Sequence, residues 1–199
     1  MKHESMKHES MKDGGGYGRF LAMIAVSAVC MYFLMFLNID RIQHFVLSEI
    51  RIYMTFIMAA VMTVVMLAFM LDMYKSRRVN GLIVFGAIGL FTVSVWLVRS
   101  QATVQDRSWM TSMIPHHSVA IMTSSRAEFH DYRVAELAAE IVEVQEREIA
   151  LMEWLLADIA ENGQARTPEE AARRAAPDTF PGVPKASSVL DDIYIRPEH

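Results

Sequence analysis

The stretch around which the chain is organised is WMTSMIPHHSVAIM, Trp109 to Met122. It contains three methionines and two adjacent histidines. Thioether sulfur and imidazole nitrogen are together the donors that suit copper(I) or silver(I). At about 100° per residue, one face of a helix through this stretch carries Met110, Met113, Ile114, His117 and Ile121. Pro115 lacks a backbone donor, so such a helix either begins near Pro115 or bends there.

A helical hairpin is predicted on both sides of a short connection at His130 and Asp131. Its first helix runs from about Val104 to Phe129 and is either separate from the preceding apolar segment or continuous with it. Asp131 is a typical N-cap for the second helix, from about Tyr132 to Asn162. Gly163 then provides a typical helix end.

The second helix of this hairpin carries an apolar stripe with alternating spacings of four and three, as in helical bundles. The stripe consists of Val134, Ala138, Ile141, Gln145, Glu148, Met152, Leu155 and Ile159. Glu148 lies near its middle, where an unpaired carboxylate is costly. We expect its partner to be His116, His117, Arg126 or a metal. The other charged residues, Glu136, Glu140, Glu143, Glu146 and Arg147, are interpreted as a solvated face.

The first half of the chain contains three long apolar runs, and 53% of all residues are hydrophobic. The runs are Phe20–Leu37, Ile52–Leu71 and Leu82–Val98, and none contains Lys, Arg, Asp or Glu. Each approaches the roughly 20 residues needed to cross about 30 Å of hydrocarbon. We therefore expect three membrane spans, the first of them retained rather than cleaved as a signal peptide.

Positive charges predict the orientation of these spans. Seven lie on the side of the N-terminus and the second loop, against two in the first loop. The seven are Lys2, Lys7, Lys12, Arg19, Lys75, Arg77 and Arg78, and the two are Arg41 and Arg51. This asymmetry places the N-terminus in the cytoplasm and the C-terminal half outside it.

The chain thus divides into four parts of an all-α protein. Residues 1–18, which contain a repeated Met-Lys-His-Glu-Ser, are expected to form a flexible cytoplasmic tail. Residues 19–99 form the membrane domain and residues 104–162 the hairpin. Residues 163–199 contain a capping box at Thr167-Pro168-Glu169-Glu170, a short helix to about Ala175 and an extended tail. This tail is expected to pack through Phe180, Val189 and Ile193.

Other features of the sequence narrow its function or leave it open. The net charge of -4 gives no support for nucleic-acid binding, and no nucleophile with an adjacent base points to an enzyme. The only cysteine, Cys30, lies in the first span, so no internal disulfide can form.

The second span has methionines at spacings of four, Met54, Met58, Met62, Met66 and Met70. This row is interpreted either as flexible packing between membrane helices or as a path for a soft metal.

The motif Met113-Ile114-Pro115-His116-His117, followed by Ala120-Ile121-Met122, resembles the signature of the bacterial domain-of-unknown-function 305 family. The spacing of Leu137-Ala138, Ile141, Gln145, Glu148-Ile149, Met152 and Trp154-Leu155 is similar to that family's second helix. The resemblance implies a ferritin-like helical domain, exported or anchored in the bacterial inner membrane, with copper handling in some members. The residues it implicates are Met110, Met113, His116, His117, Met122, Gln145, Glu148 and Met152. The Glu-x-x-His pairs of di-iron carboxylate proteins are absent, which argues against an oxidase or iron-storage role.

Two functions are compatible with these patterns. The first is a membrane-anchored extracytoplasmic binder of copper(I) or silver(I) that acts in metal homeostasis or resistance beside a metal-transport partner protein. Its metal ligands would come from Met110, Met113, His116, His117, Met122 and Met152, with Glu148 accepting an imidazole N–H. The second is a structural adaptor that docks onto a partner membrane protein, with the histidines as buried polar links. Two amphipathic helices cannot enclose the whole stripe, so we expect it to be covered either by a second copy in a homodimeric four-helix bundle, or by the C-terminal tail or the membrane spans.

Overall fold

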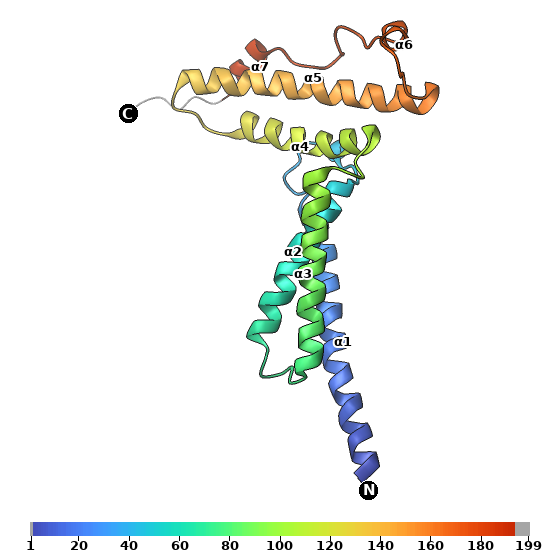
Figure 1. The fold of residues 1–199 in the computed structure, drawn as a ribbon. Coiled ribbons are helices and arrows are strands. Elements are labelled where there is room, and N and C mark those ends of the chain that lie inside the picture. Colours follow the sequence, from blue (N-terminus) through green and yellow to red (C-terminus); the bar gives the residue numbers. More distant parts are fainter. Residues whose placement is uncertain (1, 194–199) are drawn as a thin grey trace. The chain divides into compact units, whose positions relative to one another are not determined.

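The computed structural model describes residues 2–193, with side chains described from residue 16 onward. All regular secondary structure in this range is helical (Figure 1). The elements are α1 (Lys2–Leu34), the 3-10 turn η1 (Ile42–His44), α2 (Glu49–Phe69), α3 (Arg77–Ser100), α4 (Asp106–Arg126), α5 (Tyr132–Asn162), α6 (Pro168–Arg173) and α7 (Ala186–Asp192). The chain forms two compact units, Met1–Met35 with Glu49–Thr103, and Phe36–Ser48 with Val104–His199.

The first unit contains three helices that are long and apolar enough to cross a membrane. Their apolar ranges are Gly16–Leu34, Glu49–Phe69 and Arg77–Ser100, which confirms the three expected apolar helices. The first ends at Leu34 rather than Leu37, because the chain turns over residues 35–38. The second begins at Glu49 and ends at Phe69, before a turn over residues 70–73.

The first unit is held together by the packing of α2 against both α3 and α1. Phe20, Ile24, Ala59, Leu67 and Tyr74 form a buried apolar cluster. Partly buried methionines of the α2 row pack against it, namely Met62, Met66 and Met70. These contacts are those expected of methionine as a packing residue.

The N-terminal segment differs from the flexible tail expected for residues 1–18. Helix α1 begins at Lys2 and continues through the repeat into the first apolar span. Lys, Glu and Met favour helices, and adding residues to an existing helix needs no new nucleus. The sequence argument considered the repeat alone and omitted the helix to which it is attached.

The second unit is built on the hairpin of α4 and α5, which lie side by side in Figure 1. Asp131 is the N-cap of α5, as expected, and its carboxylate accepts the Arg133 backbone N–H at 2.9 Å. Gly163 ends α5 with φ 75°, which glycine adopts without strain. Helix α4 passes through Pro115 instead of beginning there. Gln101, with φ 53°, ends α3, so α4 is a separate helix.

The buried face of α5 is shifted by about one residue from the expected stripe. It consists of Ala135, Ala138, Ala139, Val142, Glu146, Ile149 and Met152. Val134 is 47% exposed, and Glu148 lies at the edge of the interface instead of in its middle. Glu146, interpreted as solvated, is buried. The predicted position of the buried face was wrong because it assumed that Glu146 faces solvent. Glu146 is buried, and its carboxylate has an ion-pair partner elsewhere in the chain.

The C-terminal segment folds back onto α5. Thr167 caps α6 by accepting the Glu170 backbone N–H at 3.2 Å, and Glu170 accepts the backbone N–H of Arg166 at 2.8 Å. Helix α6 ends at Arg173, slightly before Ala175. The segment expected to be extended contains α7, whose Val189 joins the hairpin core together with Ile193, as expected. Residues 194–199 lie outside the described residues.

Candidate metal-binding site

His117 occupies the interface between α4 and α5. Its side chain is 10% exposed. Nε2 lies 2.8 Å from Glu148 Oε2 on α5, and Nδ1 lies 3.0 Å from the Met113 carbonyl one turn earlier on α4. His117 therefore joins the two helices, and of the partners expected for Glu148 it is the one that the structure shows.

The hydrogen-bond partners of His117 restrict where its protons lie. A carbonyl oxygen only accepts, so Nδ1 must carry a proton and donate it to Met113. Nε2 lies at hydrogen-bond distance from the Glu148 carboxylate. Both ring nitrogens are engaged, and a metal ion could bind either nitrogen only by displacing a hydrogen bond.

Methionines occupy the next layer of the hairpin. In an antiparallel helix pair, the position one turn before His117 faces the position one turn after Glu148. These positions are Met113, which packs against the core cluster, and Met152, which belongs to it and is 5% exposed. Met110 is also in this cluster and 4% exposed. Three thioethers and one imidazole therefore follow one another along the same interface.

The remaining predicted residues lie elsewhere. His116 is exposed, with its ring centroid 6.0 Å from that of His117. Met122 is half-buried, but along α4 it follows His117, whereas Met110 and Met113 precede it. Gln145 is also half-buried. Within residues 16–193, no three His, Cys, Asp or Glu side chains are grouped as metal ligands, so a metal site here would depend on methionine sulfur.

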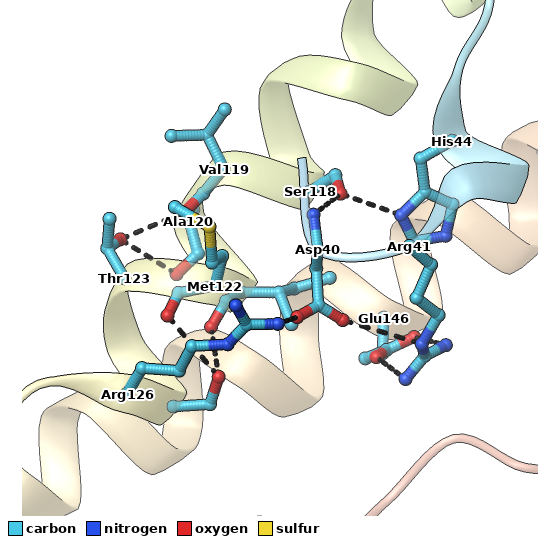
Figure 2. Close-up of polar contacts among 12 residues, drawn as sticks. Asp40, Arg41, His44, Ser118, Val119, Ala120, Met122, Thr123, Arg126 and Glu146 are labelled. Carbon is cyan, nitrogen blue, oxygen red and sulfur yellow. Dashed lines mark hydrogen bonds and ion pairs between the residues drawn. The ribbon is translucent and has the colours of Figure 1, made fainter. Parts of the chain in front are cut away.

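A second polar network begins directly beside His117, at Ser118 (Figure 2). Ser118 is fully buried, and its Oγ accepts the Asp40 backbone N–H at 2.7 Å. The same oxygen lies 2.7 Å from His44 Nδ1. Asp40 and His44 belong to the loop of residues 36–48, between α1 and α2, which lies against the hairpin. His44 is only 4% exposed.

Ion pairs extend this network on both sides. Arg41 donates from both terminal nitrogens to Glu146, at 2.5 and 3.1 Å. Arg126 donates to Asp40 at 3.0 Å, as Figure 2 shows. The buried carboxylate of Glu146 is thereby neutralised by a guanidinium that reaches it from the loop.

The environment of His44 favours its neutral form. Burial lowers the pKa of His44, and the neighbouring Arg41 charge lowers it further. Glu153, Glu146 and Asp40 act in the opposite direction with smaller effects. With Nδ1 unprotonated, the Ser118 hydroxyl donates to His44 while accepting from Asp40, so this arrangement satisfies all three groups.

The sequence analysis did not identify Asp40, Arg41, Ser118 or Glu146 as a group. Arg41 and Glu146 are 105 positions apart, and helical periodicity carries no information on such a contact. The position of Glu146 beside an apolar stripe was the only available signal, and it was interpreted as solvent exposure.

The hairpin lies within a region that matches a known family model. Residues 96–174 match the model of a family described as Domain of unknown function (DUF305). This match supports the resemblance drawn from the His-His motif, and it covers α4, α5 and α6. The family description names neither an activity nor a ligand.

An uncharacterized protein of Acanthamoeba polyphaga mimivirus is 35% identical over 71 residues, which are 35% of this chain and 47% of the relative. The match spans about half the length of that protein. No solved structure gives a significant match.

Proposed function

We propose that the hairpin of α4 and α5 binds copper(I) or silver(I) through the sulfur atoms of Met113 and Met152 and through Nε2 of His117. The observation that carries this proposal is the His117–Glu148 contact between α4 and α5, because in an antiparallel pair it implies that Met113 and Met152 lie together one turn away, in the same apolar cluster. Soft monovalent ions favour such thioether and imidazole donors. Met110, in the same cluster, completes the set.

Nε2 of His117 is a better candidate ligand than Nδ1. Nδ1 donates to a backbone carbonyl, a contact that commonly orients metal-binding histidines. Nε2 contacts a side chain that is 43% exposed and can rotate away. Glu148 would then hold the imidazole in the empty site and release Nε2 when the metal binds.

The proposed compartment is the extracytoplasmic side of a bacterial inner membrane. Unlike thiols, thioethers and imidazoles are not consumed by disulfide formation in an oxidising compartment. Three helices long and apolar enough to cross a membrane would anchor the domain there. The proposed role is capture of the metal and transfer to a metal-transport partner protein, in homeostasis or resistance.

Competition with a chromophoric copper(I) chelator tests the proposal on the full chain in detergent. We expect Met113→Leu with Met152→Leu to lower the affinity by more than the roughly 10-fold to 100-fold typical of residues outside the coordination shell. Leucine preserves the apolar volume, so the fold should be retained. Met122→Leu is the matched control and should bind as the unchanged protein does.

His117→Ala should also abolish high-affinity binding, whereas His116→Ala should have little effect because His116 is exposed. Unchanged affinity in both the double methionine variant and His117→Ala would refute metal binding at this site.

A structural adaptor is the second candidate function. It is supported by exposed apolar side chains on α5, Val134, Leu137 and Val144, which a partner membrane protein or a second copy of the chain could cover. This function predicts that the methionine variants leave every property unchanged, whereas Leu137→Glu disrupts association.

A further inference from the structure

The loop of residues 36–48 is a structured element with its own buried groups. Phe36 and Phe45 pack with ring centroids 4.2 Å apart, and Phe36, His44 and Ser48 are at most 5% exposed. Its polar contacts with α4 are the two bonds at Ser118 Oγ, to Asp40 and to His44, and the ion pair of Asp40 with Arg126. Such an attachment is sensitive to any change at His44.

We propose that the loop of residues 36–48 is a proton-released strap, which is attached to the hairpin while His44 is neutral and separates from Ser118 when His44 is protonated. Neutral His44 accepts the Ser118 hydroxyl at Nδ1. Protonated His44 cannot accept at Nδ1, so the Ser118 hydroxyl would lose the acceptor for its own proton. Protonation would also place a positive charge in a buried site near Arg41.

The charges around His44 set the direction of this response. The loop contributes Arg41 and Asp40, and α5 contributes Glu146 and Glu153. Arg41 is paired with Glu146, and Asp40 with Arg126, so much of the nearby negative charge is already compensated. The lowered pKa of His44 agrees with this balance and keeps the strap attached at neutral pH.

Release of the strap would act on the segments that join the two units of the chain. Residue 36 follows α1 and residue 48 precedes α2, so the loop continues into two apolar helices at its ends. The strap includes none of the proposed metal ligands and does not depend on metal binding. Acidification would therefore free the loop from Ser118 in the metal-free protein.

Spin-label mobility in the full chain tests the proposal. The lone cysteine is replaced by Cys30→Ala, and a nitroxide is attached at Ile42→Cys, where the native side chain is 77% exposed. Between pH 8 and pH 5 we expect the spectrum to change from a restricted to a mobile component. A second label at Leu137→Cys, at a 55% exposed position on α5, should show no change.

His44→Asn provides the matched variant, because its amide can bond to Ser118 without titrating. We expect its loop to remain restricted at pH 5, and the loop of Ser118→Ala to be mobile already at pH 7.5. His44→Gln replaces His44→Asn if the label at position 137 indicates misfolding at pH 7.5.

Three results would overturn the strap. One is a restricted loop across the whole pH range, and another is the same transition in the His44 variants. The third is simultaneous release of the label on α5, which would indicate unfolding of the whole unit.

Discussion

His117 and His44, which contacts the neighbouring Ser118, have opposite chemical environments. His117 has an oxygen partner at each ring nitrogen, the Met113 carbonyl and the Glu148 carboxylate. His44 lies beside a hydroxyl and an arginine, and burial lowers its pKa. The first is suited to exchange a proton for a metal ion, and the second to remain neutral until the surroundings become acidic.

His44 should make the stability of the second unit dependent on pH. Its pKa is lower in the folded protein than in the unfolded chain, so the unfolded chain binds the proton more readily. The stabilisation is present above the ordinary pKa of about 6.5 and declines as the pH falls below it. Urea unfolding at pH 7.5 and 5.5, followed by the fluorescence of Trp109 and Trp154 in a Trp96→Phe background, should show this loss. The His44→Asn variant should lose less stability between these two pH values.

The Arg41–Glu146 ion pair should contribute measurably to stability, because the Glu146 side chain is only 7% exposed. Arg41→Ala leaves that carboxylate buried without its guanidinium, and hydrogen bonds to charged groups are worth about 1.5–3 kcal/mol. In a double-mutant cycle with Glu146→Ala, we expect a coupling energy of about 1–3 kcal/mol. The same denaturation assay measures it. A coupling near zero would mean that water replaces the guanidinium, since Arg41 itself is 52% exposed.

At the scale of the elements, local sequence signals predicted α5 well and its packing less well. The N-cap at Asp131 and the helix end at Gly163 are each predicted from one or two residues, and both lie where expected. The buried face depends on partners, and small residues such as Ala135, Ala138 and Ala139 give weak periodicity. His117 was one of four partners expected for Glu148 from the cost of an unpaired carboxylate, whereas the contact of Arg41 with Glu146 had no local signal.

Helix α7 should depend on its apolar side chains to stay against α5. Val189 and Ile193 are 8% and 6% exposed, and Glu143 accepts the backbone N–H of Ala186 at 2.7 Å. Ile193→Ala should cost about 2–4 kcal/mol of docking free energy, the usual range for such truncations. The expected result is faster proteolysis within residues 175–185. Ser187→Ala, at an exposed position, should leave the cleavage rate unchanged.

At the scale of the whole molecule, composition predicted the division of the chain better than any motif did. The three apolar runs correspond to α1, α2 and α3, because a span is recognised from length and hydropathy alone. The loop between the first two runs was treated as a simple connection. This loop, Phe36–Ser48, belongs to the second unit because it contacts residues far along the chain.

The charge asymmetry predicts that the hairpin and the strap face the same extracytoplasmic side. Lys75, Arg77 and Arg78 lie in and after the connection between α2 and α3, which positive charge should retain in the cytoplasm. In a Cys30→Ala background, Ser187→Cys should react with a membrane-impermeant maleimide in intact cells. Ile42→Cys should react as well, whereas Lys75→Cys should react only after the cells are permeabilised. Labelling of Lys75→Cys in intact cells, with Ser187→Cys protected, would invert the topology. The oxidising compartment would then no longer favour thioether over thiol ligands, and the metal proposal would lose that support while the contacts of His117 remained.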